Sequence, residues 1–350
     1  MHKENKFDQE FKPQLKKKKY WKWILLLLLF LVVIFLIYLL YIYGLFNIMV
    51  NKKTSPVQDA KNLIYPGNLQ GEETGDVNLL FIGMRSKDMN EAYSSSAMMI
   101  INLDIENNKM NLISIPRDLW VPIDGKFGKA NSIYKTAAEN TDKYPENGLP
   151  FVKKTFSDVL AIDINYIFVC DFNSFEKIID RIGKINVAMS EDEAKRYPFL
   201  SEDLFKNTRD KTEPTIYHFD GEQSFVFVSW PKNAVPDFDR LRRMQLYLFS
   251  FTKDYIRASS ILDPSKTKDV LNIAGNNIKM DMQFWEIVKI TNIANKIKLN
   301  SVKQYKLTTN TDTDGGLLRE SQYDHTTYNP IAGDSDFSQI QEWAEAIINN

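Results

Sequence analysis

The sequence predicts an α/β layered domain carried behind a single N-terminal transmembrane helix. Two observations support this prediction. Apolar runs of strand length alternate through most of the chain with segments whose apolar residues recur at helical spacing, and that alternation is typical of an α/β layer fold. Near the N-terminus, the run from Trp23 to Phe46 is almost wholly apolar and contains no Asp, Glu, Lys or Arg.

Composition narrows the class of protein. The 350 residues include 44 Lys and Arg against 45 Asp and Glu, a formal net charge of -1, and such a length allows two ordinary domains or one large domain with appendages. Near-neutral charge argues against a dedicated nucleic-acid binder, which must neutralise phosphates. The single cysteine, Cys170, excludes an intrachain disulfide framework and a zinc site built on paired cysteines.

The N-terminal region predicts a membrane anchor. Residues 1–22 form a lysine-rich stub, and residues 23–46 exceed the roughly 20 apolar residues that cross a bilayer core. The positive-inside rule keeps the lysines in the cytoplasm and places the rest of the chain outside. No A-x-A cleavage pattern precedes Asn51, so a cleaved signal peptide is disfavoured. We expect a single-pass protein of the cell membrane with a cytoplasmic N-terminus and an extracytoplasmic body.

The segment after the anchor predicts a stalk, and a folded body follows it. Residues 47–76 are polar and contain several Pro and Gly residues, which is typical of a linker. The body, residues 77–350, begins with runs of buried-strand length. The predicted strands are Val77–Met84, Ser96–Asp104, Met110–Ile115 and Ile164–Phe172. After the last of these, apolar residues at helical spacing predict a helix that Gly183 ends.

Two arginine clusters are the candidates for chemistry. Pro116-Arg117-Asp118 lies just past the end of a predicted strand, the edge at which open α/β sheets bind ligands. In DFDRLRRMQ, Arg240 and Arg243 share one face near a predicted helix N-terminus, where guanidinium groups and backbone amides suit a phosphate. On spacing alone, an arginine triplet on an amphipathic helix is more often a solvated face, and a P-R-D loop is more often an internal ion pair than a binding site.

The order of these segments carries a resemblance to a known family. The run NLLFIGM is followed by SSSAMMIINLD and by MNLISIPRDLWVPI. Later come INYIFVCDFNSFEKIIDRIGKINV, FDGEQSFVFV and DFDRLRRMQ. Together they resemble the LytR–CpsA–Psr family over roughly Asn78 to Ile347.

This resemblance implies a fold and an activity. The implied fold is a mixed β-sheet flanked by helices, with a hydrophobic pocket for a polyprenyl tail. The implied activity is transfer of a glycopolymer, as a sugar phosphate, from a polyprenyl-diphosphate carrier to peptidoglycan or another surface acceptor. A Mg²⁺ ion and several arginines are implied to hold the diphosphate. Positioning and charge neutralisation supply most of the catalysis in such a displacement.

The resemblance also assigns roles to individual residues. Arg117 stands at the phosphate-binding arginine of the S-I-P-R-D motif, and Asp118 follows it in a supporting role. Arg240 and Arg243 stand at the arginines of a late G-R-x-x-R-Q motif, in which Gln245 fits the glutamine. Arg117 and Arg240 are therefore the implied catalytic residues, and all three arginines are implied to bind phosphate.

The sequence departs from the family at the implied metal ligands. Where the family has G-x-D-x-R, this chain places Arg85 at the aspartate and Lys87 at the arginine, and Ser96 stands at a second aspartate. Mg²⁺ usually keeps one or two carboxylate ligands, so its binding here is doubtful unless Asp88 takes the place of one. We hypothesise that Arg85 and Lys87 bind the phosphates directly. The alternative is that Arg85 points to solvent in a degenerate site.

Two functions of different classes remain open at this point. One is a membrane-anchored glycopolymer–peptidoglycan phosphotransferase. The other is a non-catalytic relative that binds the polyprenyl diphosphate and acts in envelope assembly. A role in transcription fits poorly, because a cytoplasmic stub of about twenty residues is too short for a DNA-binding domain.

Overall fold

The computed structural model describes residues 37–38, 40–48, 50, 55–86, 91–206, 208–210, 214–229, 238–251, 264–275, 277–313, 315–322 and 324–349. The chain divides into two units, residues 1–44 and 45–350. Most of the predicted membrane span, 23–46, lies outside the described residues. Within the part of the chain that is described, no helix combines the length and apolar character needed to cross a membrane.

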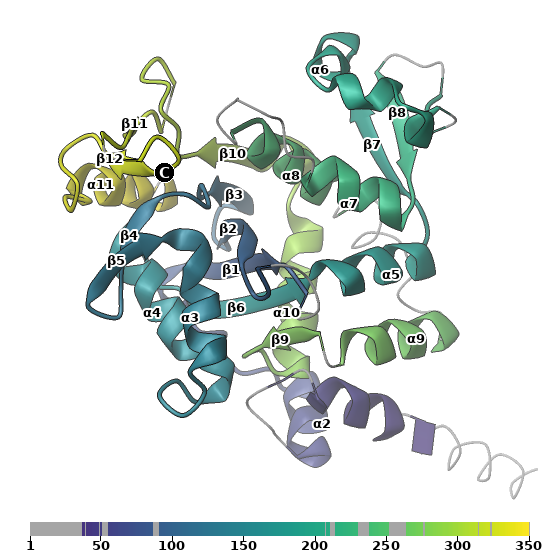
Figure 1. The fold of residues 1–350 in the computed structure, drawn as a ribbon. Coiled ribbons are helices and arrows are strands. Elements are labelled where there is room, and N and C mark those ends of the chain that lie inside the picture. Colours follow the sequence, from purple (N-terminus) through teal and green to yellow (C-terminus); the bar gives the residue numbers. More distant parts are fainter. Residues whose placement is uncertain are drawn as a thin grey trace, which may run out of the picture. The chain divides into compact units, whose positions relative to one another are not determined.

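A six-stranded mixed sheet forms the centre of the body (Figure 1), as predicted. Its strands, in spatial order, are β10 (Val302–Lys306), β3 (Lys109–Ser114), β2 (Ser95–Asp104), β1 (Asp76–Met84), β6 (Tyr166–Asp171) and β9 (Ile278–Met280). β2 pairs antiparallel with both β1 and β3, and β6 pairs antiparallel with β9. β10 pairs in parallel with β3, and β6 pairs in parallel with β1. The predicted hairpin of the second and third strands is confirmed.

Alternation along the strands divides the apolar residues between two helical layers. Leu80 and Ile82 of β1 face α3 (Ile133–Glu139), α4 (Leu149–Leu160) and α11 (Ser338–Ile348). Leu79 and Phe81 belong instead to the cluster on the other face. That face is covered by α5 (Phe172–Ile182), α8 (Phe238–Phe251), α9 (Pro264–Ala274) and α10 (Phe284–Lys296). Successive strand residues point to opposite sides of a sheet, so one run of sequence supplies both cores.

Polar residues cross the sheet in a row at the end remote from the arginines. The Nδ2 of Asn102 donates to Asp76 Oδ1 at 2.8 Å and to Asn78 Oδ1 at 2.9 Å. Asn111 Nδ2 donates to Asn102 Oδ1 at 3.0 Å and to the carbonyl of Ile347 at 3.2 Å. The row lies on the α11 face and ties three strands to the C-terminal helix.

The predicted helix after β6 is confirmed as α5. The side chain of Asp171 accepts a hydrogen bond from the backbone amide of Ser174 at 2.7 Å and so caps its N-terminus. Gly183 ends the helix with a φ of 125°, a value that favours glycine. β6 is therefore followed at once by a helix with both ends defined, and this helix packs on the sheet.

A smaller lobe follows α5. It pairs β7 (Ile185–Met189) with β8 (Thr215–Phe219) and contains α6 (Glu191–Lys195) and α7 (Gly221–Ser229). A cluster of aromatic residues, among them Tyr197, Phe199, Phe219 and Phe227, fills its core. Gly221 allows α7 to approach α5 closely, because a Cβ there would lie 2.3 Å from the carbonyl oxygen of Glu176.

The segment predicted as a stalk contains ordered structure. α2 (Pro56–Ile64) begins at Ser55, whose side chain accepts a hydrogen bond from the amide of Gln58. Val50 and Leu69 are buried in the core that faces α10. The described part of residues 47–76 therefore packs on the body, which differs from the extended linker that its Pro and Gly content predicted.

The remaining elements are short. They are β4 (Trp120–Ile123), β5 (Lys126–Lys129), β11 (Leu318–Glu320), β12 (Tyr328–Pro330) and the 3₁₀ turns η1 (Glu72–Thr74), η2 (Ala130–Ser132), η3 (Glu146–Gly148), η4 (Pro198–Ser201), η5 (Asp203–Phe205) and η8 (Leu299–Ser301). β4 pairs with β5, and β11 with β12.

Candidate functional site

One edge of the sheet gathers most of the predicted site residues. The register pairs Met84 at the end of β1 with both Ser95 and Asp171, and pairs Ser114 at the end of β3 with Lys306. The carboxyl ends of β1, β3, β6 and β10 therefore meet at the edge where β2 begins. Ligands of open α/β sheets bind at this kind of edge.

Arg240 reaches this edge from α8. Its side chain is buried, with 4% of the residue exposed, and its Nη1 donates to the carbonyl oxygen of Ser96. Ser95, the preceding residue, has a buried hydroxyl that makes no hydrogen bond within the described residues. The residue at one implied metal position thus contacts the guanidinium of an implied catalytic residue.

Arg85 lies beside the same strand start. Its backbone amide donates to the carbonyl of Ser94 at 3.0 Å, and its carbonyl accepts from the amide of Tyr93 at 3.1 Å. Its Nε lies 3.7 Å from the carboxylate of Glu91, and about a third of its side chain is exposed. Arg85 is therefore a partly exposed cation whose backbone is fixed just before β2 begins. Lys87 and Asp88 lie outside the described residues.

Arg117 belongs to an ionic cluster after β3. Its Nε lies 3.3 Å from Asp118 Oδ2, while Asp118 Oδ1 lies 3.2 Å from Lys129 Nζ. Lys129 also donates to the backbone and side chain of Thr326. Asp118 thus holds Arg117 and Lys129 together, and two cations share one carboxylate at this edge.

Two predicted residues of α8 make structural contacts. Arg243 donates through Nε to the carbonyl of Phe227 at 2.6 Å, and its guanidinium lies 5.4 Å and 5.5 Å from the ring centres of Tyr197 and Phe199. Gln245 donates to the carbonyls of Leu112 and Tyr305, so it joins α8 to β3 and β10. In these contacts Arg243 stabilises the lobe and Gln245 the sheet.

Lys306 is a cation of the edge that the sequence reading missed. It ends β10 opposite Ser114 and is half-buried. Burial, followed by the nearby Arg242 guanidinium, lowers the pKa of Lys306. Arg242 itself pairs with Glu193 at 2.7 Å. The signal that could have revealed Lys306 is a lysine at a strand end, but β10 was not predicted.

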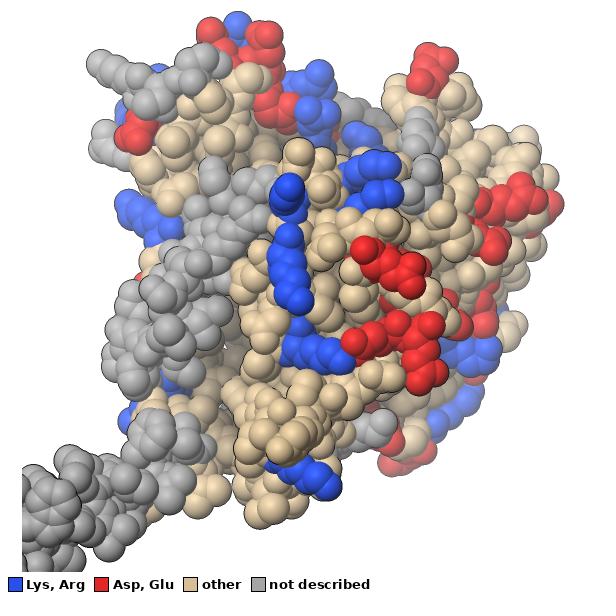
Figure 2. Space-filling model, turned by 180° about the vertical axis from the view of Figure 1, so that it is seen from behind, with Lys and Arg blue, Asp and Glu red and all other residues tan. Residues whose placement is uncertain are grey.

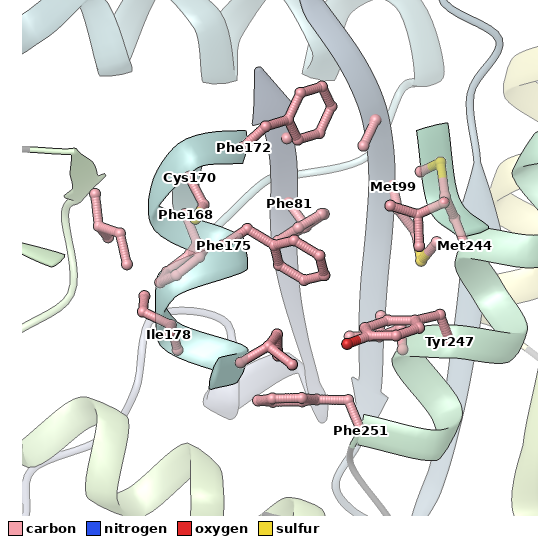
Figure 3. A pocket seen from close by; sticks show the side chains of 16 residues that line it. Phe81, Met99, Phe168, Cys170, Phe172, Phe175, Ile178, Met244, Tyr247 and Phe251 are labelled. Carbon is pink, nitrogen blue, oxygen red and sulfur yellow. The ribbon is translucent and has the colours of Figure 1, made fainter. Parts of the chain in front are cut away.

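An apolar cavity of about 190 Å³ adjoins this edge (Figure 3). It lies between one face of the sheet and the helices α5 and α8, whose Phe175 and Tyr247 rings pack edge to face at 5.5 Å. Figure 3 shows Phe81 of the sheet between the side chains of these helices. No lining residue carries a charge. A narrow cavity with such walls suits a hydrocarbon chain.

The cationic edge adjoins the cavity through neighbouring residues. Gly83 and Ala97 line the cavity and pair with each other across β1 and β2. Ser96, which accepts from Arg240, adjoins Ala97, and Met244, one turn after Arg240, lines the cavity as well. A guanidinium therefore stands at one end of an apolar cavity.

Cys170 also lines this cavity, as the small buried hydrophobe that the sequence predicted. Burial raises the pKa of its thiol, which keeps it protonated and unreactive at neutral pH.

The described residues do not fit a magnesium ion at the implied positions. The side chains there are the Arg85 guanidinium and the Ser96 hydroxyl, and a second guanidinium, from Arg240, contacts Ser96. Across the described residues, no group of three or more His, Cys, Asp or Glu could hold a metal ion. A dication needs carboxylate or other oxygen ligands, and two guanidinium groups repel it.

Comparison with known proteins identifies relatives along most of the chain. The model of the LytR_cpsA_psr family matches residues 40–331. The regulatory protein MsrR of Staphylococcus aureus (strain COL) is 23% identical over 280 residues, covering 78% of this chain and 79% of MsrR. The polyisoprenyl-teichoic acid–peptidoglycan teichoic acid transferase TagU of Bacillus mycoides (strain KBAB4) is 24% identical over 268 residues, covering 76% of this chain and 80% of TagU.

Solved structures share the fold. The crystal structure of B. subtilis TagV matches with a TM-score of 0.55 and 18% identity, covering 78% of this chain and 97% of TagV. YwtF (TagT) with bound octaprenyl pyrophosphate matches with a TM-score of 0.50 and 17% identity, covering 79% of this chain and 90% of the other.

Proposed function

Because the chain belongs to the LytR–CpsA–Psr family, we propose that it transfers a glycopolymer from a polyprenyl-diphosphate carrier to peptidoglycan or another surface acceptor. The relative TagU is named for such a transfer of teichoic acid, and TagT binds octaprenyl pyrophosphate. The proposal includes the placement expected from the sequence, with one membrane span at residues 23–46, a cytoplasmic N-terminus and an extracytoplasmic body.

One observation carries the proposal, namely a guanidinium at the end of an uncharged apolar cavity. A polyprenyl diphosphate has the same two parts, a hydrocarbon chain and a doubly charged head. The cavity beside Gly83 and Ala97 accommodates the chain, and Arg240 at its end accommodates the head. Arg85 and Arg117 extend the positive charge along the edge.

The residues of this edge perform three tasks in the proposed reaction. An acceptor hydroxyl attacks the phosphorus that bears the glycan, and the bond from that phosphorus to the bridging oxygen breaks. Polyprenyl phosphate leaves and takes up the proton that the hydroxyl loses. Arg240 binds the diphosphate near its bridging oxygen, while Arg117, oriented by Asp118, neutralises charge on the transferred phosphate. The apolar walls fix the position of the leaving group.

A second candidate function rests on Arg85 and Ser96. With a cation and a hydroxyl where the family places carboxylates, the site would bind the lipid diphosphate without transferring the glycan. The chain would then act as a carrier-binding partner in envelope assembly. Both functions require the cavity and Arg240.

A transfer assay separates the two functions. The full chain in detergent is incubated with a polyprenyl-diphosphate-linked glycan and peptidoglycan fragments, with and without EDTA, beside a relative that has both carboxylates. We expect product that persists in EDTA, because guanidinium groups supply the charge. Product that EDTA abolishes would contradict that charge assignment. Carrier binding without product, while the relative succeeds, would favour the second function.

A further inference from the structure

The end of the apolar run is built into the folded body. Phe46, the last residue of that run, is buried and packs edge to face on Phe284 of α10, with ring centres 5.3 Å apart. Val50 is buried too and forms a β-bridge with Met280 of β9. A chain that leaves a bilayer near Phe46 therefore passes directly into α10 and β9, with no free linker between.

α2 follows within a short stretch of chain. Residues 46 to 56 span at most about 35 Å when fully extended. The segment after α2 is fastened to α10, where Lys289 Nζ donates to the carbonyl of Gly67 at 2.7 Å and pairs with Glu72 at 2.5 Å. α2 is thus fixed on the body beside the point at which the apolar run ends.

The outer face of α2 is apolar. Val57 is 79% exposed, Ile64 is 72% exposed, and Ala60 between them is exposed as well. Positions 57, 60 and 64 lie on one face of a helix. Lys61 and Tyr65 border this stripe, and Tyr65 is 76% exposed. Apolar residues along one helix face, with Lys and Tyr at the border, are typical of a helix lying in a membrane interface.

We propose that α2 lies in the outer membrane interface, with Val57, Ala60 and Ile64 inserted among the lipids, and thereby docks the body on the bilayer. The occupant of this face follows from the chain itself, since the apolar run enters the body beside it. This inference rests on the proposed membrane anchor but not on any transfer activity.

Docking by α2 has a consequence for the cavity. β9 contributes Ile278 to the cavity wall and Met280 to the bridge with Val50. The strand that closes the cavity is therefore the strand on which the chain arrives from the bilayer. A docked body keeps the cavity close to the hydrocarbon from which a polyprenyl chain must come.

Charge is not the main attraction in this proposal. On the face seen in Figure 2, Lys and Arg side chains form a short file directly beside Asp and Glu side chains. Opposite charges so close together weaken the field that an anionic surface would feel. On α2 itself, Lys61 is exposed and Asp59 is buried, so a single lysine adds to the apolar contact. Binding should therefore occur on neutral phosphatidylcholine as well as on mixtures containing phosphatidylglycerol.

Fluorescence quenching tests the contact directly. Val57→Cys and Ile64→Cys are introduced singly into the full chain, labelled with an environment-sensitive fluorophore and reconstituted in phosphatidylcholine liposomes. Lys154→Cys, at an exposed position of α4, is the matched control. Unwanted labelling of the native cysteine is low because Cys170 is buried. We expect lipids spin-labelled near the headgroup to quench positions 57 and 64 strongly, and lipids labelled near the chain end to quench them less, because such helices insert only about 5–10 Å.

Three outcomes decide the proposal. Quenching at 57 and 64 but not at 154 supports it. Equal quenching at all three positions overturns it. Energy transfer between labelled chains that disappears on dilution with unlabelled chain, without lipid quenching, also overturns it and assigns the face to a second copy.

A functional readout separates this proposal from the proposed activity. The double variant Val57→Glu, Ile64→Glu should lose transfer several-fold from a membrane-embedded carrier and keep it with a short-chain, water-soluble carrier. The control Gln58→Glu, Lys154→Glu lowers the charge on exposed positions without touching the stripe. Equal loss with both carriers overturns the proposal. Wild-type chain that is quenched at 57 and 64 but transfers from neither carrier refutes the activity alone.

Discussion

The two faces of the central sheet are made by alternate residues of the same strands, yet they are filled differently. On the α4 and α11 face, Leu80, Ile82 and Ile100 are completely buried in a continuous apolar core. On the α5 and α8 face, Gly83 and Ala97 occupy strand positions with little or no side chain, and a cavity remains. One face provides stability, and the other gives up packing in exchange for a binding space.

Truncating a large side chain on each face should test this difference in packing most clearly. Phe156→Ala on α4 removes a fully buried ring from the packed face, so we expect a loss of about 3–5 kcal/mol in the free energy of unfolding. Phe81→Ala on the cavity face should cost less than half as much, because its ring already lacks neighbours on one side. Denaturant unfolding measures both, and equal losses would refute the comparison.

Two arginines of one helix should separate binding from stability. Arg240→Met removes the guanidinium at the end of the cavity, and we expect the affinity for inorganic pyrophosphate to fall roughly 10- to 100-fold, since a charge-assisted hydrogen bond contributes about 1.5–3 kcal/mol. Calorimetric titration measures this. Arg243→Met should instead lower the melting temperature and leave the affinity near wild type, because Arg243 contacts Phe227, Tyr197 and Phe199. The opposite pattern would assign the phosphate to Arg243.

Adding a bulky side chain should lower lipid affinity on the cavity face and stability on the packed face. Leu248→Trp adds bulk to the cavity wall, and displacement of two or three methylenes of a bound chain should weaken polyprenyl-phosphate binding by about 2 kcal/mol, roughly 30-fold, with little change in stability. Val152→Trp places the same bulk in the packed face and should unfold the chain at lower denaturant concentration. Tight lipid binding by the Leu248→Trp chain would place the lipid elsewhere.

The smallest expected effect concerns the polar row of the packed face. Burial, opposed by the hydrogen bond from Asn102, raises the pKa of Asp76, and Asp104 and Glu106 raise it further. The native state therefore disfavours the charged carboxylate, and this group's contribution to stability is lost as pH rises through its folded pKa. Asp76→Asn should raise the melting temperature by about 2 °C or less at pH 7 and have no effect in acid. A lower melting temperature at pH 7 would contradict this sign.

The strands β1 to β3 and the helix α5, which help to form these two faces, were largely predictable from local sequence. β1, β2 and β3 lie within one residue of their predicted bounds, because alternation and a polar turn define a hairpin locally. α5 was predicted with its end at Gly183 because helical spacing and a terminal glycine are also local signals. The family resemblance implied the mixed sheet and the hydrophobic pocket.

What the sequence did not reveal depends on distant neighbours. Helical spacing allows Arg240 and Arg243 to share one site, but Tyr197 and Phe199, far away in sequence, hold Arg243 in the lobe. The helix α2 was missed because its outer face is apolar while its Pro and polar flanks resemble a linker. Lys306 was missed because β10 has no buried residue to mark it as a strand and pairs with a strand from a remote part of the chain.

The hydrogen bond from Asn111 to Ile347 also bears on how the protein is made. These residues are 236 positions apart, so the polar row of β3 waits for a helix that is synthesised long after it. Until α11 arrives, a buried amide and the apolar side of the early hairpin lack their cover, which favours proteolysis and aggregation of an unfinished chain. A prematurely terminated product would fail at this step even with every arginine present. The late helix α11 thus completes the cover of a core that the early strands begin.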